Sequence, residues 1–228
     1  MDFQNRTVIV TGGTGALGRA VVGALLAAGA QCRLSYLHEK EADSFPYKDR
    51  VTLVGPCELT SEEDVARLYR DVDGLWASIH IAGGFAMSRL EETGKDALME
   101  MVNTNLVSSH LCSRAAVRAF KTGGRIVNVG ARPGLEPRLG AGMSAYAASK
   151  AAVIALTQAL AAELAPRDIL VNAVVPSIID TPANRASMPQ AEHDAWPKPD
   201  QIAATIAFLA SPDNRVTTGG AIPVSGRT

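Results

Sequence analysis

The 228-residue sequence lacks the features that mark several classes of protein. Its three cysteines, Cys32, Cys57 and Cys112, are scattered and odd in number, which predicts reduced thiols. Neither these cysteines nor the four histidines have the spacing of metal ligands, so no metal is expected. The net charge of −1 gives no basic excess to attract nucleic acid or an anionic membrane. No apolar run approaches the length of a membrane span and no signal peptide is apparent, which predicts a cytoplasmic protein.

The composition is typical of a globular protein, with 47% hydrophobic and 20% charged residues. At this length we expect a single domain over residues 1–228. Short β-branched runs alternate with helical stretches, which predicts an α/β fold with a Rossmann-type, doubly wound parallel sheet and helices on both faces. Strands are expected at 7–10, 31–36, 51–54, 75–81, 125–129, 170–175 and 221–224, and helices at 20–28, from 61, at 96–120, from 146 and at 202–210.

The least regular stretch of the chain is 181–199, which carries four prolines. It comes shortly after the sixth expected strand. Loops at the carboxyl ends of strands bind ligands in sheets of this kind. We therefore expect this stretch to be the substrate loop.

A glycine-rich turn joins the first expected strand to the first helix, with Gly12, Gly15 and Gly18 three residues apart. Glycines at such a turn let the backbone approach a pyrophosphate, which the N–H groups at the helix N-terminus then bind. The order strand, glycine turn, helix is the context that makes the motif credible. A turn that only caps a helix is the alternative reading.

Tyr146 and Lys150 lie four residues apart at the start of a long, apolar helical stretch. This spacing places both side chains on one helix face. An ammonium beside a phenol favours the phenolate and lowers the pKa of the tyrosine, which makes Tyr146 a plausible proton donor. Taken alone the pair is a weak signal, because Tyr and Lys often occur at this spacing by chance.

Together these motifs resemble the short-chain dehydrogenase/reductase family over essentially the whole chain. The glycine turn is similar to that family's nucleotide-binding turn in its variant Gly-x-x-Gly-x-x-Gly spacing. Asn105 lies in a segment similar to the one that carries the family's active-site Asn, and Tyr146 and Lys150 match its Tyr-x-x-x-Lys pair. The stretch 172–181 is similar to the segment that packs on the nicotinamide.

The resemblance implies hydride transfer between an NAD-type cofactor and a small molecule. Tyr146 would donate the proton, Lys150 would lower the pKa of Tyr146 and bond the nicotinamide ribose, and Asn105 would hold a water that links Lys150 to solvent. The helix over 153–164 resembles one that packs on a symmetry mate, which implies a homodimer or homotetramer. The cofactor-binding residues implied are Gly12, Thr14, Gly15, Ala16, Leu17, Gly18, His38, Glu58 at the adenine, Ala82, Gly83, Tyr146, Lys150, Pro176, Ile179 and Thr181 at the carboxamide.

Three departures from the family pattern narrow the expected reaction. No hydroxyl stands in 130–137, where the family has a Ser that bonds the substrate carbonyl, and Ser144 lies on the wrong side of the turn to replace it. The end of the fourth strand reads His80-Ile81-Ala82-Gly83, where Asn-Asn-Ala-Gly is usual, and Ser177 stands where Gly is usual. All three resemble the dihydropteridine reductase branch, whose quinonoid dihydropterin is reactive enough to be reduced without the Ser.

The identity of the dinucleotide depends on the end of the second strand. No acid stands there to bond the ribose of NAD, whereas His38, Lys40 or Arg33 could face a 2′-phosphate, so NADP is favoured over NAD. Two other functions remain open. One is a catalytically weak dinucleotide-binding sensor or partner protein, which the missing Ser supports. The other is a ketone or 3-oxoacyl reductase, which would need a substitute for the Ser.

Overall fold

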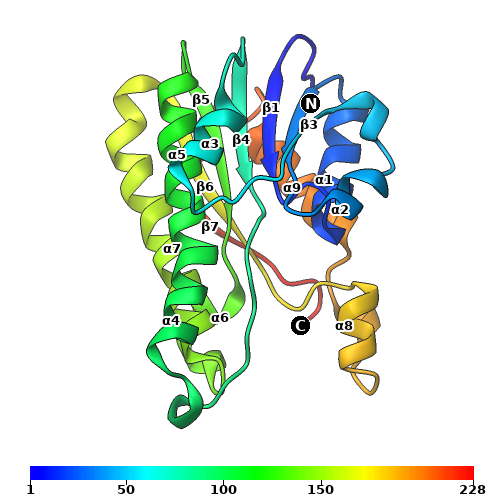
Figure 1. Ribbon diagram of the computed structural model, residues 1–228, viewed down its shortest axis with the longest axis vertical. Coiled ribbons are helices and arrows are strands. Elements are labelled where there is room, and N and C mark those ends of the chain that lie inside the picture. Colours follow the sequence, from blue (N-terminus) through cyan, green and yellow to red (C-terminus); the bar gives the residue numbers. More distant parts are fainter.

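The computed structural model describes residues 1–228 and contains one seven-stranded sheet in the order β3-β2-β1-β4-β5-β6-β7 (Figure 1). Every neighbouring pair of strands is parallel. The chain winds outward from β1 to β3, returns to place β4 beside β1, and then winds outward to β7, which confirms the predicted doubly wound sheet. The strands are β1 Thr7–Thr11, β2 Gln31–Ser35, β3 Thr52–Val54, β4 Leu75–His80, β5 Gly124–Val129, β6 Ile169–Pro176 and β7 Ala221–Val224.

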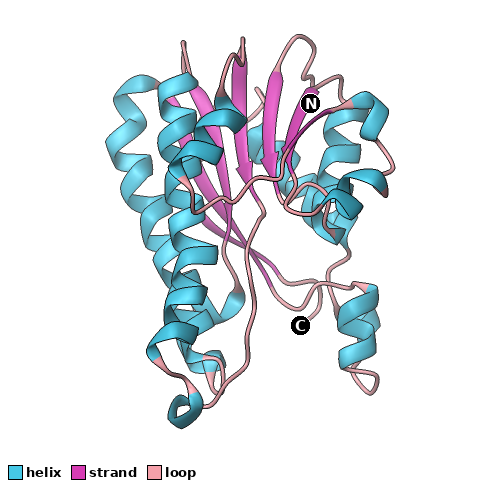
Figure 2. Cartoon of the chain, in the orientation of Figure 1, coloured by secondary structure: helices cyan, strands magenta, loops and turns pink.

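Helices cover both faces of this sheet (Figure 2). Helices α1 (Ala16–Ala27) and α9 (Pro199–Ala210) pack together on one face. Helices α3 (Glu62–Tyr69), α5 (Ser108–Ala119) and α7 (Ser144–Leu164) bury their apolar sides on the other. A sheet covered on both faces buries both sides of each strand, which explains the near-continuous β-branched runs.

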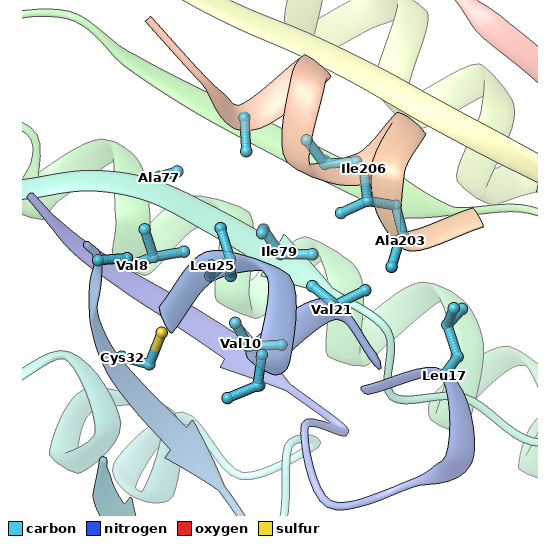
Figure 3. Close-up of a cluster of buried hydrophobic side chains, with 14 of the residues drawn as sticks. Val8, Val10, Leu17, Val21, Leu25, Cys32, Ala77, Ile79, Ala203 and Ile206 are labelled. Atoms are coloured by element: carbon cyan, nitrogen blue, oxygen red, sulfur yellow. The ribbon is translucent and has the colours of Figure 1, made fainter. Parts of the chain in front are cut away.

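The larger core cluster lies between β1, β4 and the pair α1 and α9 (Figure 3). Val8 and Val10 of β1 face Val21 of α1, and Ile206 of α9 closes the cluster from above. All four side chains are fully buried. The core therefore fixes α1 against β1, directly behind the turn that joins them.

The expected helix over 96–120 is three segments in the structure. They are α4 (Lys95–Met101), a π-helical turn η3 (Val102–Val107) and α5. A π turn accommodates one extra residue and is frequent at functional sites. Helix propensity does not reveal such a turn, so the sequence predicted a continuous helix.

Three short helices lie in segments for which no helix was expected. They are α2 (Glu39–Asp43), α6 (Arg132–Leu135) and α8 (Pro182–Ser187). Helix α1 begins at Ala16, four residues before its predicted start, because the glycine turn leads directly into it. Short 3₁₀ turns complete the chain at Lys48–Arg50, Leu90–Glu92, Pro137–Gly140, Ala165–Arg167 and His193–Ala195.

Helix α7 corrects one expectation about membranes. The stretch Ser144–Arg167 is long and apolar enough to cross a bilayer by length and composition, so the prediction that no run approaches this length is wrong. In the fold, α7 packs on β5, β6 and α6, and Val153, Ile154 and Thr157 are buried there. Its inner side is apolar because it lies in the core, whereas Ala155, Ala159 and Ala162 on its outer side are exposed.

The connections at the carboxyl ends of the strands are the longest in the molecule. Strands β4, β5 and β6 continue into loops that extend past the sheet, toward α4 on one side and α8 on the other (Figure 1). In open α/β sheets this edge carries the ligand site. The residues that follow these strands therefore define where the candidate site lies.

Candidate active site

The glycine turn between β1 and α1 is packed tightly against the end of β4. Gly12 has a φ of +66°, and a Cβ there would lie 2.6 Å from the Ala82 nitrogen. A Cβ at Gly18 would overlap the Gly12 carbonyl oxygen. Gly15 differs, because a Cβ there would approach only the Gly12 carbonyl oxygen, at 3.4 Å. Gly12 and Gly18 are thus packed tightly inside the turn, whereas Gly15 lies on its open side.

The N-terminus of α1 fits a pyrophosphate. Its N-cap is Gly15, which offers no side chain, and the first turn of the helix holds no acidic residue. The first N–H groups of a helix have no intrahelical partner, and the helix dipole favours an anion there. The tightly packed turn at Gly12 and Gly18 is followed directly by these N–H donors, so the residues present fit the pyrophosphate of a dinucleotide.

A cavity of about 420 Å³ lies over this turn. It brings together nine predicted cofactor residues, namely Gly12, Thr14, Gly15, Ala16, Leu17, Gly18, Glu58, Ala82 and Gly83. It also includes residues that the motifs did not indicate, namely Ser35, Tyr36, Leu37, Glu41, Cys57, Leu59, Thr60, Ile81, Thr104 and Ser108. Thr104 and Ser108 are four apart on the expected helix beside Asn105, which is a spacing that could have revealed them.

The basic residues expected near the second strand do not line this cavity. His38 is exposed as the N-cap of α2, and Lys40 is exposed in that helix. Arg33 is half-buried, and its Nη2 donates to the Arg67 carbonyl oxygen at 3.2 Å. None of the three lines the cavity, so a role for one of them at a 2′-phosphate stays a prediction.

Gly83, after β4, lies between Asn105 and Lys150. A Cβ at Gly83 would lie 2.6 Å from Asn105 Oδ1 and 3.1 Å from Lys150 Nζ. Lys150 is buried, and its Nζ donates to the Val129 carbonyl oxygen at 3.0 Å, at the end of β5. The π turn, α7 and the ends of two adjacent strands therefore meet at one point beside the cavity.

The side chain of Asn105 is 1% exposed and ties these segments together. Its Oδ1 accepts from the Gly84 N–H at 2.9 Å, and its Nδ2 donates to the Gly84 carbonyl oxygen at 3.1 Å and to Ser149 Oγ at 3.0 Å. Ser149 was not predicted as part of the site. Asn105 thus joins the segment after β4 to α7, and its role with a water molecule stays a prediction.

Tyr146 is half-buried beside Phe85, whose ring meets it edge to face with centroids 4.9 Å apart. Burial raises the pKa of Tyr146 to about 12 and lowers the pKa of Lys150 to about 8. The raised tyrosine pKa is opposite to the expected lowering by Lys150. The reason is that burial disfavours both charged forms and that the ammonium points to Val129. Tyr146 consequently holds its proton at neutral pH.

The segment after β5 has no hydroxyl to offer a substrate. Ala131 is 4% exposed, and α6 lies so close to α7 that a Cβ at Gly134 would come 2.7 Å from the Ala151 nitrogen. Ser144 is exposed at the first position of α7. The structure therefore shows no hydroxyl in the place where the family pattern has its Ser.

The residues expected at the nicotinamide follow β6 at the same edge of the sheet but do not line the cavity described above. Pro176 ends the strand, and Ile179 packs against the larger core cluster. Thr181 is the N-cap of α8, and its Oγ1 accepts from the Asn184 N–H at 3.2 Å. Part of the expected loop is therefore helical, with Pro182 at the first helical position, where proline is favoured.

A buried line of polar side chains crosses the sheet behind the site. Asn128 donates through Nδ2 to Thr157 Oγ1 at 2.9 Å, so its Oδ1 accepts from His80 Nδ1 at 2.8 Å. His80 Nε2 then accepts from Ser78 Oγ at 2.8 Å, and Ser78 accepts from the Tyr69 hydroxyl at 2.6 Å. With these directions, the line of hydrogen bonds runs from α3 through β4 and β5 to α7.

Burial of His80 should make the stability of the fold depend on pH. Burial lowers the pKa of His80 from 6.5 to about 4. Between these values the unfolded chain binds a proton that the folded chain does not, so this group lowers the free energy of unfolding as the pH falls. Each pKa unit corresponds to about 1.4 kcal/mol, so the interval is worth roughly 3 kcal/mol.

The measurement is denaturant unfolding of the parent and of His80→Asn between pH 7 and pH 4. At neutral pH the variant should be less stable, because Ser78 and Asn128 lose their partner. Toward pH 4 the difference should shrink, since Asn does not titrate. A difference that stays constant over this interval would show that His80 does not titrate as described.

The chain is similar in sequence to known proteins over nearly its whole length. A sequence model of the family described as enoyl-(acyl carrier protein) reductase matches residues 13–226. A cyclic-di-GMP-binding biofilm dispersal mediator protein of Escherichia coli (strain K12) is 29% identical over 231 residues, which cover 98% of this chain and 97% of that protein. A 3-oxoacyl-(acyl-carrier-protein) reductase of Pseudomonas aeruginosa is 30% identical over 247 residues, with coverage of 99% and 98%.

The fold is also similar to solved structures. The crystal structure of a short-chain dehydrogenase/reductase from Brucella melitensis, described as a glucose/ribitol dehydrogenase, superposes with a TM-score of 0.89 at 28% identity. The superposition covers 99% of this chain and 98% of that one. The likeness in fold therefore extends over nearly the whole chain.

Proposed function

Because the chain belongs to the short-chain dehydrogenase/reductase family and is thus an NAD(P)-dependent oxidoreductase, we propose that it reduces a small, activated acceptor with Tyr146 as the proton donor. The acceptor that we favour is a conjugated, quinonoid molecule, such as a quinonoid dihydropterin. The observation that carries the proposal is a half-buried Tyr146, whose pKa burial raises, one helical turn before Lys150, with no hydroxyl at 130–137.

Each residue of the site has a distinct task in this proposal. When bound, the nicotinamide dinucleotide supplies the hydride. The glycine turn and the N-terminus of α1 bind its pyrophosphate. Tyr146 gives the proton of its phenol oxygen to the substrate, and the buried Lys150 provides the positive charge that stabilises the phenolate left behind. Asn105 positions the segment after β4 against α7.

The surroundings of Tyr146 support an apolar, flat acceptor. Phe85 is 60% exposed although it contacts the Tyr146 ring, and Met87 is 65% exposed two residues further on. An aromatic edge and a thioether side chain suit a conjugated ring. A simple ketone would need a donor that polarises its oxygen, and a hydroxyl at 130–137 is what this chain lacks.

A second candidate function is reduction of 3-oxoacyl thioesters, which the similarity to the 3-oxoacyl-(acyl-carrier-protein) reductase of Pseudomonas aeruginosa supports. The test measures oxidation of NADH and NADPH with a quinonoid dihydropterin, a quinone, a 3-oxoacyl thioester and an unactivated ketone. We expect the quinonoid compounds to react fastest. Faster turnover of the thioester would support the second function instead. Dinucleotide binding without turnover of any acceptor would support a sensor.

We also propose that the protein is a homodimer or homotetramer in the cytoplasm, assembled through α7. The outer side of this helix exposes three alanines, Ala155, Ala159 and Ala162, on which a second helix can pack closely. Closed two-fold assemblies are the commonest kind of oligomer. Ala159→Arg should therefore shift the molecular mass in light scattering toward the monomer at micromolar concentration. Ala27→Arg, at an exposed alanine of α1, is the control and should leave the mass unchanged.

A further inference from the structure

We propose that Glu41 selects NADH over NADPH, by placing its carboxylate where the 2′ position of the adenosine ribose binds. The inference rests on the proposed function in that it concerns the same dinucleotide site. It assigns a role to a residue that no motif indicates, since Glu41 lies six residues after β2 and within the short helix α2.

The position of Glu41 follows from its contacts. Its Oε2 accepts from the Leu37 N–H at 3.3 Å and from Thr14 Oγ1 at 3.3 Å. Leu37 follows β2, and Thr14 belongs to the glycine turn, so the carboxylate bridges the two segments that flank an adenosine ribose in this fold. Glu41 is half-buried and lines the cavity together with both partners.

Two features suit the Glu41 carboxylate to accept a hydrogen bond from a ribose hydroxyl. The backbone N–H of Leu37, which could otherwise donate to a phosphate oxygen, already donates to Glu41. The other oxygen, Oε1, accepts no hydrogen bond within the protein and remains free for a ribose hydroxyl. An acid that bonds the ribose 2′-hydroxyl is what favours NAD in doubly wound folds.

No cation offsets the charge of Glu41 within the cavity. The cavity lining contains no Lys, Arg or His. Arg19 of α1 donates through Nε to the Thr14 carbonyl oxygen at 2.8 Å and through Nη2 to Ser44 Oγ at 3.4 Å. Arg19 forms no ion pair with Glu41. A 2′-phosphate would therefore meet a like charge without compensation.

The test compares dissociation constants of NADH and NADPH, measured by calorimetry on the full chain without substrate. Like charges in direct juxtaposition cost several kcal/mol, and about 1.4 kcal/mol is a factor of ten in affinity. We therefore expect NADH to bind at least about tenfold more tightly than NADPH. Adenosine 2′,5′-bisphosphate and 5′-AMP serve as half-site probes, and 5′-AMP should bind more tightly.

Two variants test whether the charge of Glu41, and not a change in folding, causes the preference for NADH. Glu41→Gln removes the charge and keeps the size, so the preference for NADH should fall toward equal binding. Asp43→Asn, at an exposed position of the same helix, is the matched control and should leave the preference unchanged. Circular dichroism and thermal unfolding check that each variant is folded.

The outcomes distinguish this inference from the proposed function. Equal or tighter binding of NADPH by the parent would overturn the role of Glu41 and leave the reductase proposal intact. The same holds for a preference that Glu41→Gln does not change in a folded protein. Failure of the parent to bind either dinucleotide would overturn the proposed function itself.

Discussion

Tyr146→Phe should lower the turnover of an acceptor that needs protonation by about 10²–10⁴-fold, the range that positioned general acid–base catalysis supplies. The change removes the phenol oxygen and keeps the ring that packs on Phe85. Burial raises the pKa of Tyr146 to about 12, so the parent carries the proton at neutral pH and the variant has none to give. Steady-state kinetics with the fastest acceptor of the panel provide the measurement.

Cofactor affinity is the control for this variant. The dissociation constant of the dinucleotide should remain nearly unchanged, since the phenylalanine fills the same space. Lys150→Ala should differ, because we expect Lys150 to contact the ribose as well as to support Tyr146, so it should weaken binding and turnover together. Full activity of Tyr146→Phe on every acceptor would rule out Tyr146 as the proton donor.

Gly15→Asp should abolish dinucleotide binding while the protein remains folded. A side chain at Gly15 meets only the Gly12 carbonyl oxygen at 3.4 Å, and its φ of −73° suits any residue. The fold therefore tolerates the change. An aspartate there brings a negative charge to the N-terminus of α1, where we expect the pyrophosphate to bind. We expect an increase in the dissociation constant of at least about 100-fold, since like charges in contact cost several kcal/mol.

Gly15→Ala is the matched variant, because it adds the same Cβ without the charge. Its affinity should fall much less than that of Gly15→Asp. Calorimetric titration with the preferred dinucleotide measures both variants, and circular dichroism confirms that they are folded. If Gly15→Asp binds the dinucleotide as tightly as the parent, the glycine turn is not the pyrophosphate site.

The sequence predicted those parts of the molecule that depend on regular periodicity. The buried strands read as β-branched runs, and the glycine turn stood in the right context, so the sheet and the start of α1 could be foreseen. The π turn at Asn105 could not, because an extra residue in a helix leaves no signature in helix propensity. Sequence therefore placed Asn105 on a helix without showing why its side chain turns toward Gly84.

The site was predicted less completely where it depends on packing. The effect of Lys150 on Tyr146 was inferred from spacing, but burial sets the direction of both pKa shifts. Glu41 was missed because its place beside Thr14 results from the short helix α2, and five residues are too few for a periodic signal. His38, Lys40 and Arg33 were considered for a 2′-phosphate because they lie in or just after the second strand, but none of them lines the cavity.

The contact between the glycine turn and the end of β4 has a consequence for the thermodynamics of ligand capture. Gly12 is held against Ala82, and Gly18 against Gly12, by contacts within the protein alone. The glycine turn is therefore ordered before a dinucleotide binds. Its conformational entropy is lost on folding, so binding does not have to order it again. Hydrogen exchange at the Gly15 amide, which donates to the Gly12 carbonyl oxygen at 3.2 Å, should therefore be slow before the ligand arrives, and saturating ligand should slow it little further.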